Sequence, residues 1–427
     1  MSGHPSVHRH DLDSARVRAL FPALGGETVF LDNAGGSQVP RVVADAMHRY
    51  LVESYVQLGA DYALSRQATA TVRQAHDVVS VLMNAGSGDA EAGKVILGAS
   101  TSELVNRLAQ AYAEVWEPGD EVIVSEAAHA SNADPFMRLA SGRGLRAAGL
   151  TVKTWHVDPT TGEASLEALR QLVGPRTRLI AVPHVSNILG AVLDLGPVVA
   201  LARSVGARVL VDGVAYAPHR AIDVTAWGVD WYVYSTYKVF GPHAAALYGS
   251  HAALAEVTGP NHGFIPKDEL PRKFELGGVN HEGAAGIAAL PRYLAALVGE
   301  GERADQPLER ARVEAAFEVI TRLELPLQVR LLEDLVRRPD VRVIGPISSG
   351  LERVGVVSFV HARRSSAEIA RAANGRGLGI RFGHFYAYRL CQALGLDPDD
   401  GVVRVSFAHY NTMAEVERLI TFFDEVL

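Results

Sequence analysis

Short apolar runs rich in Val and Ile alternate with amphipathic segments along the first part of the chain. The runs are residues 94–101 (KVILGAST), 121–129 (EVIVSEAAH), 178–187 (RLIAVPHVSN), 208–213 (RVLVDG) and 230–238 (DWYVYSTYK). Each run ends in polar or small residues, which is typical of parallel strands buried on both faces. Residues 101–116 and 165–173 have helical spacing between these runs. The alternation predicts an α/β fold with a doubly wound, mainly parallel sheet.

The pattern changes after about residue 285. Long helical segments at 284–299 and 307–325 are followed by strand-like residues 354–360 and 402–410. We therefore expect a large domain over residues 20–285 and a smaller C-terminal α+β domain over 286–427, which the N-terminal segment 1–19 joins. Residues 262–283 are dense in Gly, Pro and charge, and a long irregular loop of this kind is commonly functional.

Composition narrows the classes of protein. The 427 residues are 48% hydrophobic and 21% charged, which is ordinary for a folded protein, and no stretch supplies the roughly 20 apolar residues of a membrane span. A net charge of -7 without a long basic run argues against nucleic acid and favours a small-molecule partner. A single cysteine, Cys391, excludes a multi-cysteine metal site and fits a reducing compartment, so we expect a cytoplasmic protein that holds no metal.

Polar residues follow the predicted strands at the point where each strand ends. They are Thr101 and Ser102, then His129, Asn187 and Asp212, and finally Ser235, Tyr237 and Lys238. Ligands of open parallel sheets bind beyond the carboxyl ends of the strands. We therefore expect the chemistry of the protein at these residues.

Four of these residues suggest a combined site. Thr101 and Ser102 open a helix, where free N–H groups favour a phosphate, although N-capping would explain the hydroxyls equally well. Burial of the Asp212 carboxylate would be costly unless it meets a cation such as a protonated ring nitrogen. The alternative is that Asp212 is an ordinary turn residue. A partly desolvated Lys238 has a lowered pKa and can attack a carbonyl, whereas most single lysines are solvated surface charges. The combination favours a Schiff-base lysine.

The chain resembles a known family from about residue 28 to its C-terminus. The motifs are FLDNAGGSQVP (30–40), TSE (101–103), GDEVIVSEAAHASN (119–132), HVSNILG (184–190), LVDG (210–213), YSTYKVFGP (234–242), FELGGVN (274–280), GIRFGHFYA (379–387) and VRVSFAHYNT (403–412). They are similar to those of fold type I enzymes that use pyridoxal 5′-phosphate (PLP), in the class V aminotransferase branch and particularly the group II cysteine desulfurases. The resemblance implies a large PLP-binding domain with a sheet of the seven-stranded type.

The resemblance also implies roles for individual residues. Lys238 would hold PLP as a Schiff base and move the substrate Cα proton, Asp212 would pair with the pyridine nitrogen, and His129 would stack on the ring. Asn187 would reach the ring hydroxyl. Thr101, Ser102, Ser235 and Tyr237 match positions that bind phosphate, with Tyr237 in place of the usual histidine.

Substrate and partner follow from the same resemblance. Arg404 would bind the carboxylate of a small amino-acid substrate, and Asn33 and Arg381 lie in motifs that line the substrate site. The family forms homodimers with shared active sites. Gly278 stands where a threonine usually reaches the partner subunit's phosphate, and Ala215 replaces a glutamine that supports the cofactor.

One departure bears on the reaction. Group II desulfurases carry a cysteine in a pattern like RxGHHC, which attacks the substrate sulfur and stores it as a persulfide. Here the stretch is RFGHFY, so Tyr386 occupies the cysteine's place, and a phenol cannot form a persulfide. Cys391 lies in a helix-like apolar segment, where we expect it to be buried. We therefore predict a lyase that cleaves a C–S or other Cβ bond by β-elimination, with His384 or Tyr386 protonating the leaving group.

Other readings stay open at this point. An aminotransferase or an amino-acid epimerase would use the same Lys238, and a catalytically silent relative would keep the same fold. Residues 88–95 (GDAEAGKV) resemble a phosphate-binding P-loop, but Val95 stands where Ser or Thr is required. A nucleotide hydrolase is therefore disfavoured.

Overall fold

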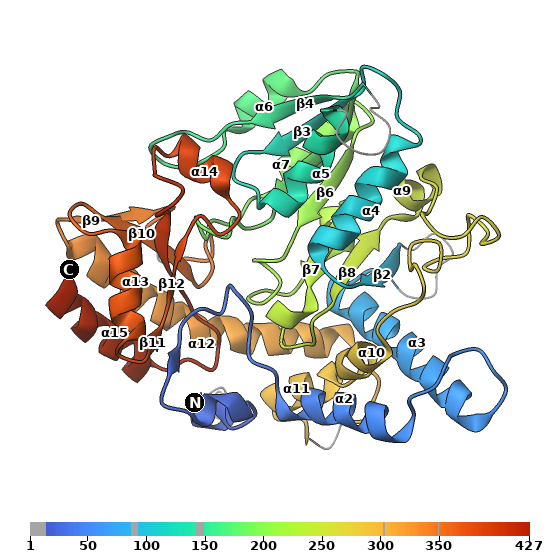
Figure 1. Ribbon diagram of the computed structural model, residues 1–427, viewed down its shortest axis with the longest axis horizontal. Helices are drawn as coiled ribbons and strands as arrows, with labels where there is room; N and C mark the ends of the chain where they lie inside the picture. Colours follow the sequence, from blue (N-terminus) through green and yellow to red (C-terminus); the bar gives the residue numbers. More distant parts are fainter. Residues whose placement is uncertain (1–13, 87–92, 142–148, 302–303, 349) are drawn as a thin grey trace, which may run out of the picture.

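The computed structural model describes residues 14–86, 93–141, 149–301, 304–348 and 350–427. Its large sheet has seven strands in the order β2-β8-β7-β6-β5-β3-β4 (Figure 1). The strands are β2 (Lys94–Gly98), β3 (Glu121–Ser125), β4 (Thr151–Trp155), β5 (Thr177–Pro183), β6 (Arg208–Asp212), β7 (Trp231–Ser235) and β8 (Ala245–Gly249).

The five predicted strands run in one direction. β3, β5, β6 and β7 form parallel ladders, as expected. The sheet is mainly rather than wholly parallel, because β2 pairs antiparallel with β8, and β8 pairs antiparallel with β7. Because two reversals restore the direction, the carboxyl end of β2 still lies at the same edge as the others. The sequence analysis missed β8, which is short and rich in alanine, and β4, which is a partly exposed edge strand.

Helices cover both faces of this sheet because alternate strand residues point to opposite sides. Ile96 and Val124 pack under α4 and α5, whereas Val95 and Ile123 belong to the core on the opposite face. The helices of this region are α2 (Arg41–Glu53), α3 (Ala63–Met83), α4 (Thr101–Ala113), α5 (Ala130–Ala140), α6 (Leu166–Leu172), α7 (Leu195–Ser204), α8 (Val224–Trp227) and α9 (His251–Glu256). The arrangement is the doubly wound layer structure that the alternation predicts.

A smaller antiparallel sheet, with the order β12-β13-β10-β9, lies beside the large one (Figure 1). Its strands are β9 (Val341–Ile344), β10 (Val356–His361), β12 (Arg381–Gly383) and β13 (Val402–Ser406), and its flanking helices are α13 (Ser366–Asn374), α14 (Tyr388–Ala393) and α15 (Met413–Val426). A separate two-stranded pair joins β1 (Val29–Phe30) to β11 (Leu378–Gly379). The N-terminal part of the chain therefore contacts the C-terminal part.

The long helix α12 (Arg310–Arg337) connects the two regions. Val313 and Phe317 lie in the core of the large sheet, whereas Leu331 and Leu335 lie in the core of the small one. The helix extends well beyond the predicted residue 325 and continues through Pro326.

The predicted helix 284–299 is two helices. α10 (His281–Ala288) ends before Ala289, and α11 begins at Leu290 and ends at Leu297. Pro291 has no N–H to continue the hydrogen bonding of α10, but it is tolerated in the first turn of α11. The predicted domain boundary at residue 285 falls inside α10 and stays a prediction.

Two expectations concern residues that the structure does not describe. The N-terminal segment 1–13 and most of the P-loop-like stretch, residues 88–92, lie outside the described ranges. The stretch continues into Lys94 and Val95, which begin strand β2 rather than a helix. No described helix is long and apolar enough to cross a bilayer.

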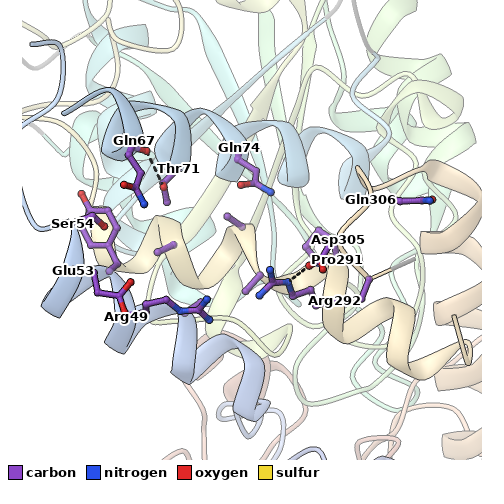
Figure 2. A pocket seen from close by; sticks show the side chains of 16 residues that line it. Arg49, Glu53, Ser54, Gln67, Thr71, Gln74, Pro291, Arg292, Asp305 and Gln306 are labelled. Carbon is purple, nitrogen blue, oxygen red and sulfur yellow. Dashed lines mark hydrogen bonds and ion pairs between the residues drawn. The ribbon is translucent and has the colours of Figure 1, made fainter. Parts of the chain in front are cut away.

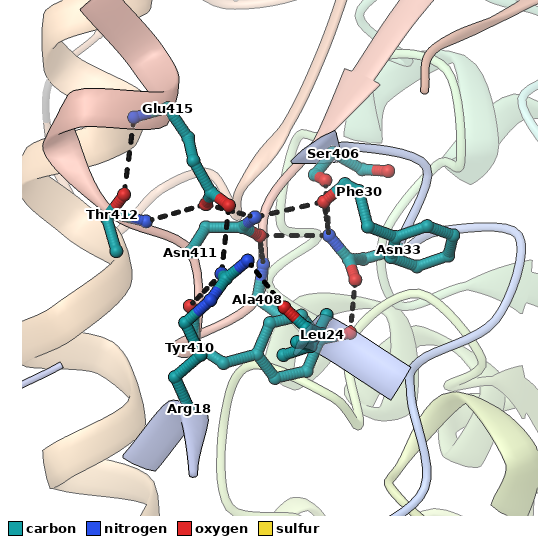
Figure 3. Close-up of polar contacts among 10 residues, drawn as sticks. All are labelled: Arg18, Leu24, Phe30, Asn33, Ser406, Ala408, Tyr410, Asn411, Thr412 and Glu415. Carbon is teal, nitrogen blue, oxygen red and sulfur yellow. Dashed lines mark hydrogen bonds and ion pairs between the residues drawn. The ribbon is translucent and has the colours of Figure 1, made fainter. Parts of the chain in front are cut away.

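A buried polar network joins the two ends of the chain (Figure 3). The Asn411 amide nitrogen donates to the carbonyl of Phe30 at 2.9 Å and to Glu415 at 3.0 Å. Its oxygen accepts from Asn33 at 3.0 Å and from the N–H of Ala408 at 2.9 Å. One buried amide therefore satisfies four groups from both ends of the chain.

Replacement of this amide tests the network. Asn411→Ala would leave buried donors and acceptors unpaired, so we expect it to lower the free energy of unfolding by about 2–4 kcal/mol in urea titrations. The matched control is Glu417→Ala on α15, which removes an exposed ion pair with Arg330 and should cost less than about 1 kcal/mol. Equal losses in the two variants would contradict the role of Asn411.

Candidate active site

Lys238 lies directly after β7, in a single 3-10 turn of residues Thr236–Lys238. The turn is fixed because the Thr236 hydroxyl donates to the carbonyl of Pro242 at 2.6 Å and the N–H of Gly241 donates to the carbonyl of Thr236 at 3.0 Å. Phe240 takes a left-handed φ of 62°, which closes the loop back toward β8. The Gly-Pro sequence after the lysine therefore sets the place of its amine at the strand end.

The surroundings of Lys238 favour its neutral amine. Burial and the nearby Arg404 guanidinium lower its pKa to about 8, although the Asp212 and Asp32 carboxylates act in the opposite direction. Asp212 ends the adjacent strand β6 and is buried. Burial raises the pKa of Asp212, while the N–H of Val214, which donates to its Oδ1 at 2.9 Å, and Lys238 lower it. An amine and a carboxylate are thus held together out of water.

Hydroxyl groups gather at the N-terminus of α4. Thr101 Oγ1 lies 2.8 Å from Ser235 Oγ, and both residues are buried. Ser102 is exposed in the first turn of the helix. The ring of Tyr237 stacks on that of His243, with 4.4 Å between the ring centroids. The structure therefore brings Thr101 and Ser235 together, with Ser102 on the first turn of α4 and Tyr237 in the turn after β7.

His129 precedes α5 and caps it. Its Nδ1 accepts from the N–H of Ser131 at 3.1 Å and lies 2.7 Å from the Ser131 hydroxyl. Burial, with the charges of Lys238 and Arg404, lowers the pKa of His129 to about 4. The ring is therefore neutral near pH 7, which suits stacking rather than proton donation.

Tyr386 lies beside this histidine. The two ring centroids are 5.2 Å apart, and the N–H of Ala130 donates to the carbonyl of Tyr386 at 2.8 Å. The Tyr386 side chain is 66% exposed, so its hydroxyl is accessible. His384 Nδ1 accepts from the N–H of Tyr386 at 3.0 Å. The loop after β12 thus brings His384 and Tyr386 to the N-terminus of α5.

Arg404 and Arg381 are cross-strand neighbours on β13 and β12. Both contact one carboxylate, since Arg404 Nη2 lies 3.2 Å from Asp32 Oδ1 and Arg381 Nη1 lies 3.4 Å from Asp32 Oδ2. Arg404 is buried and burial lowers its pKa to about 10, so it stays charged at neutral pH. Its Cζ lies only 3.7 Å from the centroid of the Phe385 ring.

Asn187 connects these groups. Its carbonyl accepts from Arg404 Nη1 at 3.3 Å, and its amide nitrogen donates to the carbonyl of Phe385 at 2.8 Å. In the described part of the chain, Asn187 Oδ1 and Arg404 Nε are buried without a hydrogen-bond partner. Such orphaned polar atoms indicate a place for a ligand.

Sequence reasoning missed Asp32 and Phe385. Asp32 follows an apolar run, VFL, which is the same signal that identified Asp212. Nothing in the sequence indicated Phe385, because its contact with Arg404 depends on the fold of the loop.

Two predicted residues lie elsewhere. The amide of Asn33 is engaged in the buried network of Figure 3, where Tyr410 donates to its oxygen and its nitrogen donates to the carbonyl of Ser406 at 2.7 Å. Gly278 is exposed, has a φ of 90° and lines a separate cavity of about 540 Å³ with Phe264. The predicted roles of both residues stay predictions.

A polar groove of about 330 Å³ opens between α2, α3 and α11 (Figure 2). Arg49 and Glu53 of α2 face Gln67 and Thr71 of α3 across it, and Arg292 pairs with Asp305 at 2.8 Å. None of the predicted site residues lines this groove. The candidate site is therefore the strand-end cluster around Lys238.

Comparison with known proteins agrees with this architecture. The family model described as Aminotransferase class-V matches residues 29–419. The chain belongs to the class V aminotransferase family. An aminotransferase-like protein of Gibberella zeae is 40% identical over 420 residues, which cover 96% of this chain and 98% of that protein.

Cysteine desulfurases are also similar to this class V aminotransferase family member. A probable cysteine desulfurase of Vibrio cholerae is 32% identical over 425 residues, covering 95% of this chain and 96% of that protein. The apo structure of a cysteine desulfurase from Thermococcus onnurineus superposes with a TM-score of 0.82 at 26% identity, covering 96% of this chain and 97% of that one. These likenesses confirm the fold type I architecture.

Enzymes of the class V aminotransferase family depend on PLP, and the chain is a PLP-dependent enzyme of this family. The described residues fit the cofactor. Lys238 offers an amine of lowered pKa, and Asp212 offers a buried carboxylate that can meet a protonated ring nitrogen. Thr101 and Ser235 offer hydroxyls at the N-terminus of a 13-residue helix, where a phosphate is favoured.

The lowered pKa of Lys238 predicts how the apo protein captures PLP. Only the neutral amine attacks an aldehyde, so the rate of imine formation should rise with pH, reach half of its maximum at about pH 8 and level off at higher pH. Stopped-flow absorbance over a series of pH values measures this profile, and Lys238→Ala supplies the background from other lysines. A midpoint near 10.5, the ordinary value for lysine, would contradict the burial of this amine.

Proposed function

We propose that the protein is a PLP-dependent lyase that cleaves a C–S or other Cβ–substituent bond of an amino acid by β-elimination, without a cysteine that carries a persulfide. The observation that carries this proposal is the loop after β12, where an accessible Tyr386 hydroxyl stands beside His129. Elimination needs no thiol at this place, only a proton donor for the departing group.

The only cysteine supports the same proposal. Cys391 is fully buried in α14, and burial raises the pKa of its thiol to about 11. The thiolate is the nucleophilic form, and this thiol is neither ionised near pH 7 nor accessible. A single buried cysteine also supports the cytoplasm as the proposed compartment.

Arg404 and Lys238 would have separate roles in the reaction. Bound PLP supplies an electron sink that acidifies the substrate Cα–H bond. Arg404 would bind the substrate carboxylate through its unpartnered Nε–H edge, which fixes the Cα–H bond relative to Lys238. The Lys238 amine takes the Cα proton, and the Cβ–substituent bond breaks with its electron pair on the leaving group.

A proton must then reach the leaving group. The Tyr386 hydroxyl, or the His384 ring behind it, would supply that proton, and solvent would return it because the side chain is exposed. The products are the protonated leaving group and an enamine, which water hydrolyses to pyruvate and ammonia for a three-carbon substrate.

A second candidate function is transamination. It is favoured by the 40% identity with a protein named aminotransferase-like, and epimerisation by the same Lys238 is its close variant. Both reactions move protons at Cα and leave the Cβ bond intact. They require no acid at the place of Tyr386.

Product analysis separates these reactions. We expect holoenzyme incubated with L-cysteine, S-methylcysteine and β-chloroalanine to release pyruvate, ammonia and the leaving group in equal amounts, without an added keto acid. Product formation that depends on a keto-acid acceptor, or a change of stereochemistry alone, would refute the lyase.

Variants connect the reaction to the residues. Lys238→Ala should reduce pyruvate formation by about 10³-fold or more, and Tyr386→Phe should slow thiolate release by about 10²-fold. Cys391→Ser should keep the rate within about twofold, because the thiol takes no part. A Cys391→Ser variant without activity but with a normal unfolding midpoint would contradict elimination without persulfide.

We also propose that the enzyme acts as a homodimer whose partner completes the site through the loop around Gly278. Phe264, which lines the same cavity as Gly278, is 76% exposed, and Tyr55 and Tyr62, in the segment between α2 and α3, are 66% and 52% exposed. Large apolar side chains left in solvent are what a partner subunit would cover. The glycine at φ 90° allows the loop backbone to approach a neighbour closely.

An interface variant tests the dimer. Phe264→Glu would bury a charge in the proposed interface, so we expect sedimentation velocity to show monomers where the parent protein is dimeric, together with weaker PLP binding. Val336→Glu on α12, whose side chain is 51% exposed, is the matched control and should stay dimeric. A Phe264→Glu protein as dimeric as the control would contradict the placement of the interface.

A further inference from the structure

The loop after β12 holds an aromatic ring against the buried arginine. Phe385 lies with its ring centroid 3.7 Å from Cζ of Arg404 and 5.8 Å from Cζ of Arg381. A guanidinium so close to a ring face is attracted by the negative charge density of the ring. The ring also covers one face of Arg404 and leaves that guanidinium accessible only from its edges or its other face.

The conformation of this loop is unfavourable by itself. Phe385 and Tyr386 have φ values of 48° and 60°, so two consecutive residues with side chains occupy the left-handed region. Such a conformation persists only where the surroundings stabilise it.

Contacts from two other elements supply that stabilisation. The Asn187 amide donates to the carbonyl of Phe385 at 2.8 Å, and the N–H of Ala130 donates to the carbonyl of Tyr386 at 2.8 Å. These two hydrogen bonds hold the unfavourable backbone conformation, and in that conformation the Phe385 ring contacts Arg404. Strained backbone at such a place is commonly connected with function.

The other contacts of Arg404 leave one part of it free. Nη2 meets Asp32 and Nη1 meets the carbonyl of Asn187, while Nε is buried without a partner in the described part of the chain. The protein therefore contacts both terminal nitrogens of the Arg404 guanidinium and one of its faces. The Nε–H group is the donor that remains free, and its direction depends on the plane of the guanidinium.

We propose that Phe385 is a positioning residue that fixes the plane of the Arg404 guanidinium, so that its free Nε–H edge meets the carboxylate of the amino-acid substrate. The inference rests on the proposed function of Arg404 and adds the residue that orients it. Phe385 itself touches no reacting atom in this arrangement.

Two simple amines test the proposal on the holoenzyme. Glycine and methylamine both displace Lys238 from the cofactor and change its absorbance, but only glycine carries a carboxylate. We expect Phe385→Ala to weaken glycine binding about tenfold and to leave methylamine binding within about twofold of the parent. The measurement is the concentration of each amine at half of the absorbance change.

Further variants separate the ring from its volume. Phe385→Tyr keeps an aromatic face and should bind glycine within about threefold of the parent, whereas Phe385→Leu should behave like Phe385→Ala. Phe382→Leu is the matched control, because that ring on β12 lies against another arginine, 5.4 Å from Cζ of Arg371. It should bind both amines as the parent does.

Other outcomes overturn the proposal. Equal weakening of both amines in Phe385→Ala would show that the residue holds the cofactor or the fold, and unchanged glycine binding would show no role at all. A parent enzyme that binds glycine no more tightly than methylamine would refute the role of Arg404 and this inference together. The absorbance change needs no turnover. If Phe385→Ala weakens glycine binding alone and the parent enzyme forms no pyruvate, the lyase is refuted and the inference about Phe385 is supported.

Discussion

The amine of Lys238 is kept out of water at the end of β7, beside the Asp212 carboxylate and near the Arg404 guanidinium, and the other features of the site depend on this placement. Burial lowers the pKa of the amine to about 8 and raises that of the carboxylate, so each group is shifted toward its neutral form. The cost of taking such groups from water is offset only if they meet each other or a ligand. A cofactor with an aldehyde and a basic ring nitrogen offers a partner to both.

The large sheet makes this placement possible. Lys238 and Asp212 come from neighbouring strands, and β2, although its neighbour β8 is antiparallel, ends at the same edge and brings Thr101 to Ser235. The small sheet supplies what the large sheet lacks, a pair of arginines on one carboxylate. The residues proposed for the substrate and those proposed for the cofactor therefore come from different layers of the molecule, and α12 packs in both cores.

The loop after β12 completes the stretch RFGHFY, which resembles the cysteine-containing RxGHHC pattern of group II desulfurases. Its two left-handed residues bring one aromatic ring to Arg404 and another to His129. In the elimination that we propose, the phenol of Tyr386 would act as an acid at this loop, where a thiol would act as a nucleophile. In the reaction that we propose, Lys238 would act at Cα and this loop would decide the fate of the Cβ bond.

The amino-acid sequence was enough to identify the strand ends and the residues that follow them, because buried parallel strands are short continuous apolar runs and the first polar residue after each run marks its end. Lys238, Asp212, His129 and Thr101 were found in this way. The tertiary structure was needed to show that β8 separates β2 from β7 and that Asp32 joins two arginines. The face of Arg404 that Phe385 covers was likewise invisible in the sequence. These features arise from contacts between residues far apart in the chain, for which local apolar periodicity carries no signal.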